Sequence, residues 1–290
     1  MSSKKKRYQT QTARQPRPMQ PVRPVRKPVA GPPVWIGPVA VAAFVAVVIG
    51  AFFLYRWYST PLPVPSPSPA SEAALIHTIT TLPASQFEAI GQGSANNLIK
   101  PVTGTVLTGA TGKPEVLYIG GEFCPFCAAQ RWPLIIALSR FGTFTGLSTT
   151  ASSDSIEFPN TPTFTFRTAK YTSQYIDFRG VETSDRTQQP LMTLTPAEDQ
   201  TFGKYNPGRT IPFIDFGNKY TSVGAMYSPD LLAGQSWQAI VDELKDPSSN
   251  QARAIIGSAN LITAAICQMT SNQPSTVCTP MIQDLQKKLT

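Results

Sequence analysis

The chain has 290 residues and a formal net charge of +8, from 25 lysines and arginines against 17 aspartates and glutamates. The positive excess belongs to residues 1–33, which contain nine lysines and arginines and no acidic residue. Residues 59–290 contain 15 basic and 17 acidic side chains, so this larger part has no basic surplus with which to attract nucleic acid. We therefore expect no nucleic-acid partner.

A run of 22 residues without a formal charge, 34–55, follows the basic tail and is dense in valine, alanine, isoleucine and phenylalanine. As a helix it measures about 33 Å, enough to cross the hydrocarbon core of a bilayer. Trp35, Tyr55 and Trp57 flank it in the manner of interfacial aromatic residues. A cleaved signal peptide is the alternative, but the run is long for one and lacks a clear small-residue cleavage site. We expect an uncleaved transmembrane helix at 34–55.

The charges around this span predict its orientation. Nine cations precede it and one, Arg56, follows it, which is typical of an N-terminus in the cytoplasm. We expect residues 1–33 to be a disordered tail, a single pass through the cell membrane, and residues 76–290 to form one domain outside the cytoplasm. Residues 56–75, rich in proline and serine, are expected to be an extended linker that holds this domain off the membrane.

Hydrophobic periodicity and turn residues predict the elements of this domain, which we expect to have an α/β fold. The expected helices are 72–82, 84–92, 125–141, 196–205, 236–244, 250–270 and 279–289. The expected strands are 97–107, 115–120, 144–150, 161–171, 175–183, 210–216 and 219–226. The regions 161–171 and 175–183 are expected to pair with each other or to extend the sheet edge, and the last two strands to form a hairpin.

The most informative stretch is Cys124-Pro125-Phe126-Cys127, which comes just after the apolar run 116–121. If that run is a strand and the next segment a helix, Cys124 lies at the helix N-terminus, where unpaired N–H groups and the helix dipole favour a thiolate. Cys127 is one turn further on, within reach for a disulfide. The pattern indicates a dithiol redox site, with Cys124 as the exposed nucleophile and Cys127 as the buried resolving thiol.

The other two cysteines, Cys267 and Cys278, are left for each other. Outside the cytoplasm a stable disulfide is permitted, and we expect this pair to be structural and to close a short loop. Their spacing has no companion histidine for a zinc site, since the only histidine, His77, lies far away near the linker. We expect no metal and no cofactor.

The order of strand, Cys-Pro-x-Cys helix, strand, inserted region, Ile-Pro strand hairpin and helix resembles the thioredoxin fold. The runs 118–132 and 137–142 are similar to a family of thioredoxin-like proteins, domain of unknown function 929, with a resemblance that covers roughly residues 80–285 and is specific around the dithiol. It implies a thioredoxin-like fold with an inserted β-rich segment and extra C-terminal helices, here preceded by one transmembrane helix. The family has no settled substrate.

The resemblance also implies roles for residues around the dithiol. Ile211 and Pro212 match the segment that carries a cis-proline beside the dithiol and faces the substrate, although an ordinary edge-strand proline is the alternative. We expect Phe123 and Phe126 to offer apolar surface to a substrate peptide. Glu122 is a candidate proton acceptor if it points inward, but an exposed carboxylate on the rim is the expectation we favour.

Further along the same helix, Arg131 either supports a thiolate or lies on the solvated face, and we expect the solvated face. Trp132 is expected in the core, and Pro133 is expected to bend the helix. The aromatic residues expected in the core of the sheet are Phe158, Phe164 and Phe166.

An oxidising location favours the introduction or rearrangement of disulfides over their reduction. We therefore expect a thiol:disulfide oxidoreductase, an oxidase or isomerase, whose partners are exported cysteine-containing proteins and an unidentified redox protein. The alternative is a catalytically silent binding or scaffold module in which Cys124 and Cys127 form a structural disulfide. Copper delivery is a weaker alternative because no histidine or methionine cluster adjoins the thiols.

Overall fold

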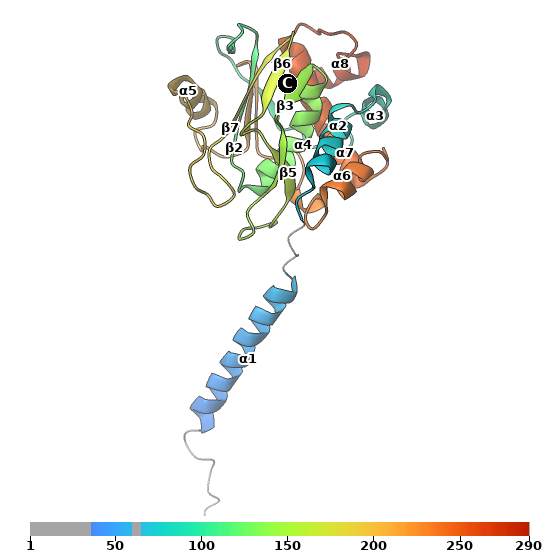
Figure 1. Cartoon of the computed structure of the whole chain (residues 1–290). Coiled ribbons are helices and arrows are strands. Elements are labelled where there is room, and N and C mark those ends of the chain that lie inside the picture. The colour runs from blue at the N-terminus through green and yellow to red at the C-terminus, as the bar shows by residue number, and fades with distance from the viewer. Residues whose placement is uncertain (1–35, 60–64, 290) are drawn as a thin grey trace, which may run out of the picture. The chain divides into compact units, whose positions relative to one another are not determined.

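The computed structural model describes residues 36–59 and 65–289, which fall into two compact units on either side of Ser59 (Figure 1). The expected tail at 1–33 and the first residues of the expected span lie outside the described residues. In the first unit, helix α1 (Ile36–Ser59) continues four residues beyond the expected end of the span. The large apolar side chains described between Val39 and Tyr55 are exposed.

One helix in the described ranges, α7 (Asn250–Met269), is long and apolar enough to cross a membrane by length and composition. Within the second unit 83% of that apolar stretch is buried, as in a core helix. The stretch Val41–Tyr55 of α1 is apolar but shorter.

The second unit begins earlier than expected, because helix α2 (Pro69–Thr80) starts inside the predicted linker. The Ser68 side chain accepts the N–H of Ser71, and Pro69 occupies the first helical position, where its missing N–H costs nothing. Helix α2 buries Leu75 and Ile79 in the domain core. A short helix, α3 (Ala84–Ile90), follows and buries Phe87.

A five-stranded sheet is the centre of the domain, with strand order β1-β9-β8-β2-β7. Its strands are β1 (Ile99–Pro101), β2 (Glu115–Gly120), β7 (Asp177–Glu182), β8 (Phe213–Phe216) and β9 (Tyr220–Val223). Strand β2 pairs parallel with β7 and antiparallel with β8. The first strand is much shorter than the predicted 97–107, although the N–H of Val102 still donates to the Lys219 carbonyl oxygen just beyond its end.

Two small antiparallel sheets lie outside the central one: β3 (Gly142–Thr145) pairs with β6 (Lys170–Ser173), and β4 (Ser148–Ala151) with β5 (Pro162–Thr165). The predicted single strand 144–150 is broken at Gly146, whose φ is +71° and where a Cβ would lie 2.6 Å from the Thr168 carbonyl oxygen. Of the two alternatives for 161–171 and 175–183, pairing with each other is not found, and extension of the sheet edge is confirmed for 175–183. Strand β7 joins the central sheet beside β2.

Helices cover both faces of the central sheet. Figure 1 shows α5 on one side of β2 and β7, and α2, α4 and α7 on the other. The remaining helices are α4 (Pro125–Ser139), α5 (Pro196–Tyr205), the single 3-10 turn Pro229–Leu231, α6 (Trp237–Glu243) and α8 (Pro280–Gln286). Alternate residues of β2 serve two cores: Val116 and Tyr118 pack in the main one, Leu117 and Ile119 in the smaller one that contains Phe202 of α5. The α/β class is confirmed.

The main hydrophobic core includes the contact between α7 and α4. Trp132 is fully buried there, as predicted, and its Nε1 donates to the Pro162 carbonyl oxygen at 2.9 Å. Helix α4 runs through Pro133. Phe164 and Phe166 are buried as expected, but Phe158 is only half-buried and lies beside the dithiol helix.

The predicted structural disulfide is confirmed. Cys267 near the end of α7 is bonded to Cys278, just before α8, with 5.8 Å between the two Cα atoms. Both residues belong to the main core.

Replacing this disulfide with Cys267→Ala/Cys278→Ala is expected to lower the free energy of unfolding by about 3 kcal/mol, because a loop of this length restricts the unfolded chain by that amount. Denaturant titration of the full chain in detergent measures the change. Treatment of the wild-type protein with a reductant is the control and is expected to give the same loss. Equal stability of variant and wild type under oxidising conditions would show that the bond contributes nothing.

Candidate active site: a covered dithiol above a buried ion pair

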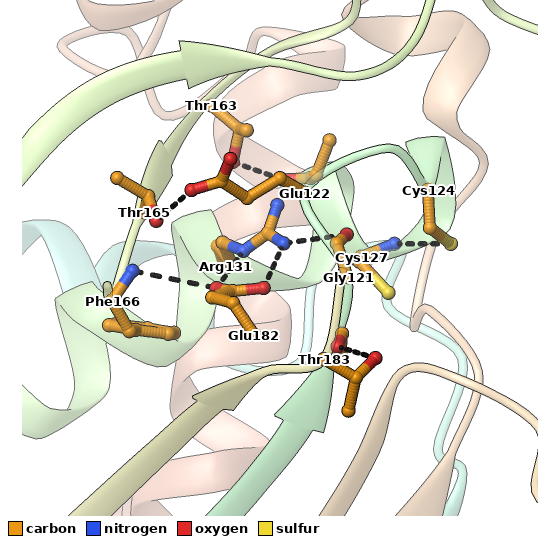
Figure 2. Close-up of polar contacts among 12 residues, drawn as sticks. Gly121, Glu122, Cys124, Cys127, Arg131, Thr163, Thr165, Phe166, Glu182 and Thr183 are labelled. Carbon is orange, nitrogen blue, oxygen red and sulfur yellow. Dashed lines mark hydrogen bonds and ion pairs between the residues drawn. The ribbon is translucent and has the colours of Figure 1, made fainter. Parts of the chain in front are cut away.

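The dithiol lies at the junction between β2 and α4. Cys124 is the residue that caps α4: its backbone is extended, and its sulfur accepts the N–H of Cys127 at 3.3 Å (Figure 2). Pro125 occupies the first helical turn, and the Cys124 N–H donates to the Gly121 carbonyl oxygen at 3.2 Å. The predicted placement of Cys124 at a helix N-terminus is confirmed.

Both thiols are free, and they differ in burial. Cys127 is fully buried, as predicted, whereas Cys124 keeps only 7% of its surface accessible. The expectation of an exposed Cys124 is therefore wrong for this conformation.

The segment 152–160, between β4 and β5, covers the residues on both sides of Cys124. The Ser153 N–H donates to the Phe123 carbonyl oxygen at 2.9 Å, and the Phe158 ring packs edge to face on Phe126 with 6.1 Å between ring centroids. Because Phe123 and Phe126 flank Cys124 in the chain, this segment lies across the start of α4. This position is consistent with the low accessibility of the thiol.

Arg186 forms hydrogen bonds with both ends of the covering segment, residues 152–160. Its Nε donates to the Ser152 carbonyl oxygen at 3.1 Å and its Nη2 to Asn160 Oδ1 at 2.7 Å. Phe158 and Asn160 both have positive φ, at 52° and 54°. Phe126 remains 40% exposed beside this segment, so apolar surface adjoins the thiol as predicted.

The surroundings shift the pKa values of the two thiols in opposite directions. A hydrogen bond from the Cys127 thiol, together with backbone N–H groups and the charge of Arg131, lowers the pKa of Cys124 to about 7 although burial opposes the shift. Burial, followed by the hydrogen bond to Cys124 and the charge of that residue, raises the pKa of Cys127 well above its usual range. Cys124 is therefore the thiol of the pair that ionises near neutral pH, and Cys127 stays protonated there.

Alkylation of Cys124 by iodoacetamide is expected to rise with pH around a midpoint near 7, because the thiolate is the reactive form and the pKa of this residue is lowered to about 7. Mass spectrometry of the modified chain measures the rate at each pH. In Cys127→Ala the largest stabilising contact is lost, so the midpoint is expected to move upward. A midpoint above pH 8 in both proteins would contradict this assignment.

Arg131 lies four residues after Cys127 and is fully buried. Its Nε and Nη2 donate to the two carboxylate oxygens of Glu182, at the end of β7, over 2.8 and 2.6 Å. Burial opposes the guanidinium charge, but Glu182 more than compensates and raises the pKa of Arg131, so it stays charged. The expectation that Arg131 lies on a solvated helix face is wrong, because β7 supplies a partner for it inside the domain.

Glu122 is also buried, with 7% of its surface accessible, and is not the exposed rim carboxylate that we favoured. Its Oε1 accepts the Thr165 hydroxyl at 2.6 Å, and the next residue, Phe166, directs its N–H to Glu182 at 3.5 Å. The end of β5 therefore anchors both carboxylates. Figure 2 shows Glu122 on one side of the Arg131 guanidinium and Glu182 on the other.

Ile211 and Pro212 lie beside the dithiol loop. The peptide bond between them is cis, Pro212 is buried, and it directly precedes the interior strand β8, so an exposed edge proline does not describe it. A Cβ placed on Gly121 would lie 3.5 Å from Ile211 Cδ1 and 2.8 Å from the Phe123 ring. The side chains of Ile211 and Phe123 thus both lie beside Gly121, in the loop that leads to Cys124.

In the parts of the chain that the structure describes, no group of three or more His, Cys, Asp and Glu side chains is arranged to hold a metal ion.

The fold and the site define an α/β domain with a free dithiol at the N-terminus of the helix that follows an interior strand. The chain belongs to the family described as Domain of unknown function (DUF929), whose model matches residues 106–268, more than half of the 290 residues. The matched range contains the dithiol and the Arg131–Glu182 pair. No curated protein and no solved structure matches the chain.

Proposed function

We propose that this protein is a thiol:disulfide oxidoreductase, an oxidase or isomerase of exported cysteine-containing proteins. The observation that carries the proposal is the separation of the two thiols: the pKa of Cys124 is lowered to about 7, and that of the buried Cys127 is raised. Such a pair suits one thiol to exchange with a substrate and the other to resolve the mixed disulfide.

The fold proposed for the domain is thioredoxin-like. Its support is the path from β2 through α4 to the parallel strand β7, followed by the antiparallel hairpin β8–β9 and by α7, which packs on α4. In this arrangement β3 to β6 form the inserted segment and α8 is an extra C-terminal helix. The cis bond before Pro212 lies where the resemblance to thioredoxin-like proteins places it.

Exchange in the oxidising direction proceeds in two displacements. A substrate thiolate attacks Sγ of Cys124 in the Cys124–Cys127 disulfide, and Cys127 leaves as a thiolate. A second substrate thiolate then attacks the substrate sulfur of the mixed disulfide, and Cys124 leaves as a thiolate. The substrate gains a disulfide and the dithiol holds two electrons, which the redox partner removes. An isomerase uses the same mixed disulfide without net electron transfer.

The proposed substrate surface is made of Ile211, Phe123 and Phe126; Pro212, which was also expected there, is buried next to Ile211. A peptide segment with apolar side chains next to its cysteine fits this surface. Glu122 is proposed as the proton acceptor when a thiol of the pair ionises. It lies two residues before Cys124, and the Thr165 hydroxyl holds its buried carboxylate in place.

The proposed location is outside the cytoplasm, with α1 as a single membrane anchor. Its support is the exposed apolar surface of the described part of α1, together with the charge bias across the 34–55 segment. The exported domain would carry the dithiol in an oxidising environment, where Cys267–Cys278 is also stable.

A binding or scaffold module with a silent dithiol is the second candidate, and the low accessibility of Cys124 favours it. The two functions are separated by exchange with a model peptide that contains two reduced cysteines. The oxidised full chain in detergent is expected to convert this peptide to its disulfide, whereas Cys124→Ser is expected to be inert. A wild-type rate equal to that of Cys124→Ser would overturn the enzymatic function in favour of the scaffold.

A further inference from the structure

The buried pair of Arg131 and Glu182 lies directly beneath the dithiol. Both side chains are fully buried, and two hydrogen bonds join them. A buried ion pair gives no more stability than well-packed apolar side chains of similar volume, because each charge loses its hydration. Stability alone therefore does not account for the pair. Its position next to the dithiol loop suggests a role in the chemistry of the thiols.

Gly121 connects Arg131 to Cys127. Arg131 Nη2 donates to the Gly121 carbonyl oxygen at 2.8 Å, which also accepts the Cys124 N–H. The backbone of Gly121 is in turn hydrogen-bonded to the Cys127 sulfur, and this contact lowers the pKa of that thiol. Arg131 thus holds the carbonyl of Gly121, the loop residue whose N–H faces the buried sulfur.

Arg131 also acts on both sulfurs through its charge. This charge helps to lower the pKa of Cys124 and opposes the rise in the pKa of Cys127 that burial causes. The other titratable groups that face this region are Glu182 from β7, Glu122 from the loop and Tyr118 from β2. Burial raises the pKa of Tyr118 and keeps it neutral. Among the described groups around the dithiol, the positive charge comes from Arg131.

Cys127 must be a thiolate in each direction of exchange: it leaves as one when a substrate attacks Cys124, and it attacks as one when it resolves the mixed disulfide. In resolution, the Cys127 thiol gives its proton to the Glu122 carboxylate, the acceptor proposed above, and its sulfur attacks Cys124 Sγ. The bond between Cys124 and the substrate breaks, and the substrate sulfur takes the electron pair. The buried negative charge on Cys127 is the costly species in both cases.

We propose that Arg131 is a positioning residue that stabilises the Cys127 thiolate during exchange, through Gly121 and through its charge, while Glu182 holds Arg131 in place and partly offsets that charge. This inference rests on the proposed function. It predicts that removing Glu182 and removing the whole pair change the reactivity of Cys127 in opposite directions.

The test uses the reduced full chain in detergent and an aromatic disulfide reagent that releases thionitrobenzoate. Attack by Cys124 releases one thionitrobenzoate and leaves a second on the protein, and attack by Cys127 releases the second. The rate of the second release reports Cys127 alone. In Arg131→Met/Glu182→Met this rate is expected to fall about tenfold, because a lost neighbouring charge raises the thiol pKa and only part of the effect is offset by greater nucleophilicity.

In Glu182→Gln the second release is expected to be about threefold faster, because the guanidinium charge is no longer offset. Arg131→Lys keeps the charge and loses the two-pronged geometry, so its rate is expected to lie between those of the wild type and the double variant. Circular dichroism verifies that each variant is folded. If the double variant does not fold, the rise in Glu182→Gln and the partial loss in Arg131→Lys decide the question.

The possible failures are distinguishable. If the wild type releases only one thionitrobenzoate, as Cys127→Ala must, both the proposed function and the role of Arg131 are wrong. If the wild type releases two, and the charge variants leave the second rate unchanged or shift it in the same direction, Arg131 has only a structural role and the proposed function stands.

Discussion

Cys127→Ala is expected to accumulate mixed disulfides between Cys124 and its substrate proteins in cells, whereas the wild-type protein accumulates almost none. The physical reason is that Cys127 is the thiol one helical turn away from Cys124, and its removal leaves the intermolecular bond without its resolving nucleophile. Non-reducing gel electrophoresis of membranes after an acid quench measures the adducts, and mass spectrometry names the bound proteins.

Two controls define this experiment. Cys124→Ser/Cys127→Ala is expected to show no adduct, because the attacking sulfur is absent. Cys267→Ala/Cys278→Ala is expected to behave like the wild type, because that pair is remote from the exchange.

Since Cys127 is also the main group that lowers the pKa of Cys124, adducts of Cys127→Ala should form faster at pH 8 than at pH 6. Equal, low adduct levels in Cys127→Ala and in Cys124→Ser/Cys127→Ala would count against catalysis.

Arg131→Met is expected to lower the free energy of unfolding by about 3 to 5 kcal/mol, because it leaves the Glu182 carboxylate buried without its partner. Arg131→Met/Glu182→Met is expected to recover most of this loss, since no buried charge remains. Denaturant titration of the full chain measures all three proteins. The recovery isolates the cost of an unpaired charge from the loss of packing.

Lys287→Met is the surface control for this comparison. It breaks the ion pair between Lys287 and Asp284, whose side chains are 78% and 70% exposed, and no measurable change is expected. A single Arg131→Met variant as stable as the wild type would mean that Glu182 takes up a proton or reaches water, and the picture of a closed ion pair would be wrong.

Local pattern in the sequence was sufficient to predict the junction that carries the dithiol. The strand 115–120 ends at Gly120 and is followed by Gly121, and Pro125 follows Cys124 at the first helical turn, so strand, loop and helix each have their own signal. The pairing of Cys267 with Cys278 followed from the assignment of the other two cysteines. The start of α2 at Ser68-Pro69 had a signal as well, a capping serine followed by proline, but the proline-rich surroundings obscured it.

The burial of Arg131 and Glu122 could not be predicted in this way, because their partners come from distant parts of the chain. Glu182 lies 51 residues after Arg131, and Thr165 lies 43 residues after Glu122. Each contact depends on the positions of β5 and β7, and the sequence left open whether β7 pairs with the 161–171 region or extends the edge of the central sheet. Strand β7 itself, Asp-Phe-Arg-Gly-Val-Glu, carries three charged residues, so its sequence does not single out Glu182 as the buried one.

The covering segment 152–160 was missed for a related reason. Its contacts with Phe123 and Phe126 are a backbone hydrogen bond and an aromatic edge, neither of which leaves a periodic pattern. Phe158 was assigned to the core because it is aromatic and near two core phenylalanines in the sequence.

The reduction potential of the Cys124–Cys127 pair is the most direct test of the central claim that this dithiol is catalytic. Equilibration of the full chain with glutathione buffers, followed by alkylation and mass spectrometry, measures it. A two-electron transition between about −270 and −120 mV, the range of known dithiol catalysts, is the predicted result. A potential below about −300 mV, which is typical of structural disulfides, would contradict it.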